Sequence, residues 1–174
     1  MNDWSARDFA RFEVQAGGVT TCKNFATTVA PWIVSIEALE PFKIELPPQV
    51  PNPVSYLSGP MSRISYDINI RAEVGCGQEH VLITETHLRH IYWTPAQMVA
   101  HFTVSGANFR PGDIFATGTI SGPEESTWGC LMEKTWGGSR FWDGPNGEKR
   151  MWLEDGDDVI MQAFCKRNGV RIGF

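Results

Sequence analysis

The stretch "SYDINIR", residues 65–71, alternates polar and apolar side chains along its whole length. Alternation with a period of two is typical of a strand that buries one face. Residues 159–164, "VIMQAF", form a mostly apolar run, and residues 169–174, "GVRIGF", alternate again. Both are predicted to be further strands. Together the three stretches predict a β-rich chain.

Turn sequences divide the rest of the chain into short segments. Residues 110–113, "RPGD", suit a type II turn, because proline fixes φ at the second position and glycine accepts positive φ at the third. We expect a strand at residues 114–117 after this turn, as we do after the similar turn at residues 153–157. Residues 41–60 contain six prolines and are predicted to be an extended surface loop.

Two helices are predicted. Thr94-Pro95 places a capping hydroxyl directly before a proline at the first helical position, so we expect one principal helix near residues 95–105. A shorter helix is expected to begin near Ser5, with Asp3 or Ser5 as its cap. The predicted fold class is a β-rich α+β domain over residues 1–174, a mixed β-sandwich or roll with one principal helix.

Composition argues against several classes of partner. The net charge of −5 and the scattered lysines and arginines give no basic face for nucleic acid. The four cysteines form no Cys-x-x-Cys pair, which favours reduced thiols and a cytoplasmic location. No apolar run approaches the ~20 residues that a bilayer requires, so no membrane partner is expected.

The opening stretch "NDWSARD", residues 2–8, admits two interpretations. Asp3 and Arg7 could form an ion pair at a capped helix, which contributes only about 0.3 to 0.5 kcal/mol. Alternatively, Asp3 could act with Lys23 and Thr27, since a carboxylate, a hydroxyl and an ammonium are the groups that hold a hard cation and stabilise an oxyanion. One carboxylate is too few for Mg²⁺ or Ca²⁺, so further ligands would have to be borrowed.

Other candidate residues are equally open to a structural explanation. Thr119 lies in "GTISGPE", residues 118–124, where the glycines let the backbone approach a ligand or make a tight bend. Glu133 is either a functional carboxylate or half of a surface pair with Lys134. His87 and His90 share a face only in a helix, so we do not expect them to chelate a metal. The tryptophans could form a sugar-binding platform, but their surroundings favour the core for three of them: Trp32, Trp93 and Trp152.

Five motifs in order resemble the fumarylacetoacetase family, within the wider fumarylacetoacetate hydrolase superfamily. They are "NDWSARD" (2–8), "KNFATTVAPW" (23–32), "YWTPAQMVAH" (92–101), "RPGDIFATGTISGPE" (110–124) and "RIGF" (171–174). The resemblance implies hydrolysis of a β-diketo acid in tyrosine catabolism. In the family the first motif lies mid-protein. The chain is therefore expected to be a carboxyl-terminal catalytic domain that lacks the N-terminal half and the extreme C-terminus, and to be inactive alone.

The resemblance also implies roles for individual residues. Asp3 would bind the cation, Mg²⁺ or Ca²⁺ or both, with Lys23 and Thr27 at the metal and oxyanion site. Arg7 and Glu133 would orient the catalytic network, and Thr119 and Arg7 would contact substrate. The histidine that activates water, and further acidic ligands, lie upstream in the family. A homodimer is expected.

Three positions depart from the family pattern. Ala10 and Val14 replace a glutamine and a tyrosine that touch substrate, and Ala26 replaces a glycine near the metal loop. The first two leave the exact substrate open. A related acylpyruvate hydrolase or oxaloacetate decarboxylase is therefore a second hypothesis, and a non-enzymatic β-sandwich binding module is a third.

Overall fold

The computed structural model describes residues 1–18 and 21–173. The chain consists of two compact units, Met1–Ile33 and Val34–Phe174. Phe174 itself, the last residue of the expected C-terminal strand, lies outside the described residues.

The first unit contains one helix and a two-stranded antiparallel sheet. Strand β1 (Asn2–Asp3) pairs with β2 (Thr27–Thr28), which places Asp3 opposite Thr27. Helix α1 (Arg7–Gln15) follows β1. Its N-cap is Ala6, without a side-chain cap, so the prediction that Asp3 or Ser5 caps this helix is wrong. Asp3 instead pairs with Thr27 in the β1–β2 sheet, three residues before the N-cap of α1.

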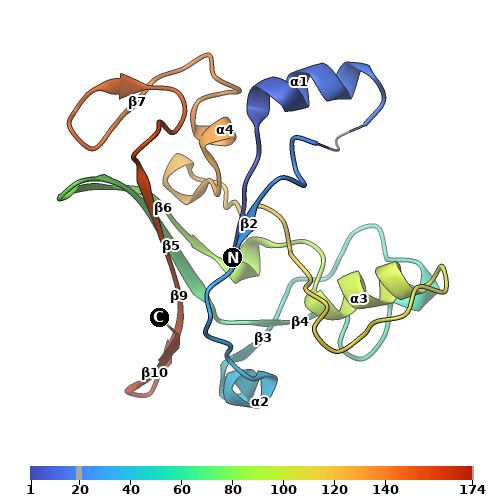
Figure 1. Cartoon of the computed structure of the whole chain (residues 1–174). Helices are drawn as coiled ribbons and strands as arrows, with labels where there is room; N and C mark the ends of the chain where they lie inside the picture. The colour runs from blue at the N-terminus through green and yellow to red at the C-terminus, as the bar shows by residue number, and fades with distance from the viewer. Residues whose placement is uncertain (19–20, 174) are drawn as a thin grey trace. The chain divides into compact units, whose positions relative to one another are not determined.

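A four-stranded antiparallel sheet dominates the second unit, in the order β10-β9-β5-β6 (Figure 1). Strand β5 (Asn69–Cys76) pairs on one side with β6 (Glu79–His87) and on the other with β9 (Asp158–Arg167). Strand β10 (Val170–Gly173) extends the sheet beyond β9. The strands predicted near residues 69, 159 and 170 are therefore present.

Two hairpins with two-residue loops connect strands of this sheet. Gly77, at φ 67°, occupies the first loop position between β5 and β6. Asn168 and Gly169 join β9 to β10, and both have positive φ, 51° and 80°. Positive φ at both central residues is the geometry of a type I′ turn, which matches the right-handed twist of the strands.

The alternating stretch at residues 65–71 is two strands and not one. Its beginning belongs to β4 (Ile64–Tyr66), which pairs with β3 (Lys43–Glu45) in a separate sheet. The break follows from local hydrogen bonds, because the Asp67 N–H donates to Phe42 O and the Ile68 N–H donates to Tyr66 O. Alternation alone could not reveal this change of partner.

The proline-rich stretch at residues 41–60 is more ordered than predicted. It contains β3 and parts of two 3₁₀ helices, η1 (Glu40–Phe42) and η2 (Ser55–Leu57). Three apolar side chains in the stretch are buried: Phe42, Leu46 and Leu57. The Val50–Pro51 peptide is cis. Most of the stretch is exposed, as predicted for a surface loop, but the prediction that it is one extended loop is wrong, because it contains short regular segments anchored by these side chains.

The principal helix is α3 (Pro95–Thr103), as predicted. Thr94 and Gln97 form a complete capping box, and the buried Gln97 side chain also hydrogen-bonds Gln49. Four shorter helical segments were not predicted. They are α2 (Ile36–Leu39), η3 (Leu88–His90), η4 (Glu125–Thr127) and α4 (Leu131–Lys134).

The segment after α3 contains the predicted turn but not the predicted strand. The Asp113 N–H donates to Arg110 O at 3.0 Å, and Gly112 has φ 97°, as a type II turn requires. Residues 114–117 belong to no strand, and Ile114 is 65% exposed. The apolar run therefore does not pair with a neighbouring strand within the described chain.

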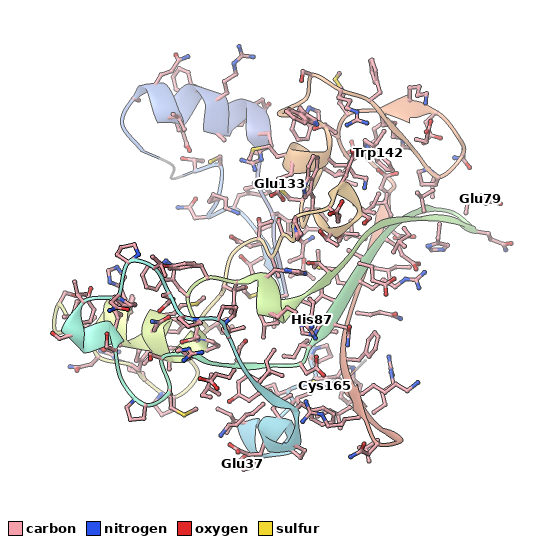
Figure 2. All side chains as sticks on the ribbon, turned by 180° about the vertical axis from the view of Figure 1, so that it is seen from behind. Glu37, Glu79, His87, Glu133, Trp142 and Cys165 are labelled. Atoms are coloured by element: carbon pink, nitrogen blue, oxygen red, sulfur yellow. The ribbon has the colours of Figure 1, made fainter. Side chains whose placement is uncertain are left out.

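The core of the second unit forms around Val74, Ile83 and Trp142, of which Trp142 is labelled in Figure 2. Strand β7 (Trp142–Asp143), which pairs with β8 (Lys149–Arg150), carries the tryptophan into this core. The core prediction was wrong for two other tryptophans, since Trp32 is 70% exposed and Trp93 is 44% exposed. The observed class is mixed α/β, with small sheets and few helices.

None of the helices in the described residues is long and apolar enough to cross a membrane.

Candidate functional site

Asp3, Lys23 and Thr27 lie together in the first unit. The Lys23 ammonium is 2.9 Å from Asp3 Oδ2, and Thr27 Oγ1 donates to Asp3 Oδ1 at 3.1 Å. Lys23 Nζ also donates to the Asp3 backbone carbonyl at 3.3 Å. The side chains of Asp3 and Lys23 are 42% and 43% exposed, so water reaches this cluster.

Local structure explains how these three residues meet. The β1–β2 ladder places Thr27 directly across from Asp3. The segment before Lys23 is tied to α1, because the Glu13 carboxylate accepts the N–H groups of Thr21 at 2.8 Å and Cys22 at 3.2 Å. The helix and the ladder thus fix the two ends of the segment that carries Lys23.

The charges of the cluster suit a cation only in part. The Lys23 ammonium holds the pKa of the Asp3 carboxyl below its usual range. Each carboxylate oxygen of Asp3 accepts one hydrogen bond and can accept a second, so Asp3 can still bind a cation. Lysine has no acceptor and can serve only as a charge partner. Within residues 1–18 and 21–173, no group of three or more His, Cys, Asp or Glu could hold a metal ion. The cluster supplies part of a hard-cation site.

Arg7 begins α1 and does not pair with Asp3, whose ionic partner is Lys23. The interpretation of "NDWSARD" as an ion-paired helix cap is therefore wrong. On the same helix Ala10 is buried and Val14 is 63% exposed. In the described chain, Trp136 and Asn168 are the only non-glycine residues with positive φ, so Ala26 does not have the backbone strain that would require glycine.

A cavity of about 280 Å³ lies in the second unit. Two sequence-predicted residues, Thr119 and Glu133, line it together with Ser121 and His90. The remaining lining residues are Ile91, Tyr92, Trp93, Met98, Thr117 and Ile120. The cavity thus has an apolar part and a group of hydroxyls beside one carboxylate and one imidazole. Among the described residues, no lysine or arginine lines it, and the His90 imidazole is the one lining side chain that can become cationic.

Glu133 is held by hydrogen bonds from two neighbours. Ser121 Oγ donates to Glu133 Oε2 at 2.6 Å, and Cys130 Sγ donates to the same oxygen at 3.3 Å. Lys134 donates instead to the carbonyl of Ile83, so the predicted surface pair of Glu133 with Lys134 is wrong. Burial raises the pKa of the Cys130 thiol. Figure 2 shows Glu133 on the short helix α4.

Two glycines make this arrangement possible. A Cβ on Gly129 would lie 2.4 Å from Ile120 O and 2.8 Å from Thr119 Cγ2. A Cβ on Gly122 would lie 2.5 Å from Thr127 Oγ1 and 2.9 Å from the ring of His90. A side chain at Gly129 would force apart the segments that carry Thr119 and Glu133, and one at Gly122 would displace the side chains of Thr127 and His90.

Sequence reasoning missed the position of three residues at or beside this cavity. Ser121 had the glycine-flanked pattern as a signal, but no spacing rule linked it to Glu133. His90 was considered only as a chelating partner of His87, whose Nε2 lies 2.7 Å from Asp67 Oδ1. Cys130 gave no signal at all, because its role depends on the fold around α4.

Comparison with known proteins places these residues in context. The family model described as fumarylacetoacetate (FAA) hydrolase C-terminal matches residues 1–171. Fumarylacetoacetase of Oryza sativa subsp. japonica is 45% identical over 176 residues, covering 100% of this chain and 41% of the relative. Fumarylacetoacetase of Homo sapiens is 42% identical, covering 100% of this chain and 42% of the relative. The chain therefore spans about two fifths of the length of the curated relatives it matches.

Proposed function

The chain belongs to the fumarylacetoacetate hydrolase C-terminal family, and we propose that the protein containing it hydrolyses a carbon–carbon bond of a β-diketo acid. Fumarylacetoacetate is the proposed substrate, with fumarate and acetoacetate as products. The identity to fumarylacetoacetases extends over the whole chain, from the Asp3 cluster to the end of the sheet, and this supports the choice.

The observation that carries the proposal is the meeting of Asp3, Lys23 and Thr27. They come from two segments separated in sequence, yet an ion pair and a hydrogen bond join them. Hydrolysis of the diketo acid adds water to a ketone and expels an enolate, which then takes up a proton. Lys23 would stabilise the negative charge of the leaving enolate, because a preorganised ammonium favours the transition state over the ground state.

A divalent cation, Mg²⁺ or Ca²⁺, is proposed as the cofactor. Asp3 would contribute one carboxylate oxygen and Thr27 a neutral oxygen, and the remaining oxygens would come from other residues of the full-length protein. When bound, such a cation would polarise the diketo oxygens. Arg7 would orient the catalytic network and contact substrate, as the family resemblance implies.

The cavity of the second unit supports two further roles. Thr119 would donate its hydroxyl to a substrate carboxylate, and Glu133 would orient the group that activates water. Because no lysine or arginine lines the described cavity, we expect an anionic substrate to be bound mainly by cations from elsewhere in the enzyme. We therefore expect the 174-residue chain to be inactive by itself.

The wider context of the protein is proposed on the same resemblance. The chain would be the carboxyl-terminal catalytic domain of a cytoplasmic homodimer, with the mixed β-roll of its family. The acylpyruvate hydrolase and oxaloacetate decarboxylase activities remain alternatives, because Ala10 and Val14 depart from the family's substrate-contacting residues.

Turnover by the full-length protein tests the proposal. Fumarylacetoacetate, an acylpyruvate and oxaloacetate are each assayed with Mg²⁺, with Ca²⁺ and with a chelator. The proposal predicts metal-dependent turnover with the highest kcat/KM for fumarylacetoacetate. Preference for either of the other acids would support the second hypothesis. Absence of turnover with all three would favour a binding module.

A further inference from the structure

The two carboxylate oxygens of Glu133 differ in the hydrogen bonds that they accept. Oε2 accepts the Ser121 hydroxyl at 2.6 Å and the Cys130 thiol at 3.3 Å. A carboxylate oxygen accepts about two hydrogen bonds, so Oε2 is saturated. Across the described residues, Oε1 has no hydrogen-bond partner. Glu133 therefore keeps one oxygen free beside the cavity that it lines.

The direction of the Ser121 hydrogen bond is fixed by a second donor. The Gly129 N–H donates to Ser121 Oγ at 3.0 Å. Because a serine hydroxyl has a single proton, and its oxygen already accepts from Gly129, that proton is directed to Glu133. The 2.6 Å separation is typical of a strong hydrogen bond from a hydroxyl to a carboxylate.

The backbone around Ser121 restricts the movement of the hydrogen-bonded groups Gly129, Ser121 and Glu133. Gly129 is packed so closely that a Cβ would lie 2.4 Å from Ile120 O. Helix α4 ends in a tight turn, in which the Gly137 N–H donates to Met132 O at 2.8 Å and the Trp136 N–H donates to Glu133 O at 3.1 Å. These are the two bonds of a Schellman motif. Both ends of the Ser121 to Glu133 hydrogen bond are thus attached to fixed backbone.

We propose that Ser121 is a positioning residue that, with a weaker contribution from Cys130, holds Glu133 Oε2 and reserves Oε1 for the proton-bearing group in the reaction. The proposal rests on the function proposed above for Glu133. A carboxylate held by one oxygen cannot rotate to exchange its two oxygens, so its acceptor stays in one place. Catalytic groups misplaced by about 1 Å lose on the order of 10²-fold in rate.

The kinetic test compares Ser121→Ala with Ser121→Thr in the full-length protein. Loss of the hydroxyl should lower kcat about 10- to 100-fold with KM within about twofold, as loss of a supporting hydrogen bond usually does. Threonine keeps the donor and should restore most of kcat. Equal losses in Ala and Thr variants of unchanged melting temperature would overturn the proposal, as would a change confined to KM.

Variants of Cys130 measure how much the weaker donor contributes to kcat. A thiol is a poor donor, so Cys130→Ala should lower kcat less than about threefold, and Cys130→Ser should equal or exceed the unmodified protein. A loss in Cys130→Ala larger than that in Ser121→Ala would contradict the assigned order of the two donors.

Crystal structures separate this inference from the proposed function. In the full-length protein, Glu133 Oε2 should contact Ser121 Oγ, and in Ser121→Ala the carboxylate should turn or occupy more than one orientation. An unchanged Glu133 carboxylate in the variant would overturn the positioning role whatever the substrate is. If the carboxylate moves but fumarylacetoacetate is not a substrate, the positioning role stands and the proposed function fails.

Discussion

Two ion pairs in this chain have the same charges and opposite surroundings. Lys23 and Asp3, 2.9 Å apart in the first unit, have side chains that are 43% and 42% exposed. Arg150 and Asp157, 2.6 Å apart in the second unit, are 7% and 3% exposed. Water screens the first pair, which therefore contributes little to folding. In the second pair each buried charge offsets the desolvation of the other.

The buried pair of Arg150 and Asp157 joins the end of β8 to the turn before β9. Arg150 ends β8, and Asp157 closes the turn before β9 by accepting the Glu154 N–H at 2.8 Å. Arg150 also lies 2.5 Å from Glu148. Within the part of the chain that the structure describes, the exposed pair is supported only by the Thr27 hydroxyl and the Asp3 backbone carbonyl, and its lysine can move to a ligand without disrupting the core. The difference teaches that exposure, and not charge, distinguishes the pair suited to chemistry.

The largest effect is expected where the buried pair is broken. Asp157→Asn keeps the shape of the side chain but removes the buried carboxylate whose two oxygens both accept from Arg150. Only Glu148 and the more distant Glu154 then offset the Arg150 charge, so the melting temperature should fall by roughly 10 °C. Differential scanning calorimetry of the full-length protein measures this change. Asp155→Asn, an exposed change in the same turn, is the control and should shift the melting temperature by no more than about 2 °C. Similar shifts in both variants would remove the distinction between the pairs.

The exposed pair should respond in activity and not in stability. Lys23→Met keeps bulk and removes the charge, so kcat should fall about 100-fold while the melting temperature changes by less than about 3 °C. Steady-state kinetics with fumarylacetoacetate measure the loss. Lys149→Met, at another exposed lysine paired with an aspartate, should keep the original kcat. A large loss of stability in Lys23→Met would show that this pair is structural too.

The buried pair should also give the protein a specific sensitivity to acid. Burial alone would raise the pKa of Asp157, but hydrogen bonds from Arg150 and the Glu154 N–H lower it below the usual 3.8. A depressed folded-state pKa contributes stability above the unfolded value, and this stability is lost as pH falls through the folded value. Below about pH 4, the melting temperature of the unmodified protein should therefore decline more steeply with falling pH than that of Asp157→Asn. Parallel curves for the two proteins would contradict this assignment.

The smallest change in basal stability is expected for Asp3→Ala. Its ion pair is exposed, so the melting temperature without cation should change by less than about 3 °C. Loss of a cation ligand should nevertheless abolish the rise in melting temperature that Mg²⁺ or Ca²⁺ produces, since a ligand that binds only the folded state stabilises it by mass action. Asp8→Ala, at an exposed carboxylate of α1, is the matched control. A cation-dependent rise preserved in Asp3→Ala would exclude Asp3 as a ligand.

Sequence patterns predicted the elements whose signals are local. The Thr94-Pro95 cap located α3, and the apolar run at residues 159–164 located β9. Pairing could not be predicted in the same way, since the apolar run at residues 114–117 forms no strand and the stretch at 65–71 serves two sheets. One local signal was overlooked: Asn168-Gly169 is the typical loop of a two-residue hairpin.

The candidate site likewise contains residues that the sequence predicted and residues that it could not predict. Motif resemblance named Asp3, Lys23 and Thr27, and the structure brings them together, although their roles stay predictions. The partners of Glu133 could not be predicted, because Ser121 reaches it only through the close packing of Gly129 against Ile120. That packing depends on tertiary structure, and no periodicity or spacing in a single sequence encodes it.

The order of strands in the main sheet has a consequence for folding in the cell. Strand β5 can pair with β6 as soon as their hairpin forms, but its other neighbour, β9, begins only at Asp158. During synthesis one edge of β5 therefore stays without its hydrogen-bond partner while the whole segment from β6 to β8 is made. Contacts so distant in sequence form slowly, and an open strand edge can pair with other chains. A nascent chain of this protein is thus most prone to aggregate after β6 has emerged and before β9 has followed it.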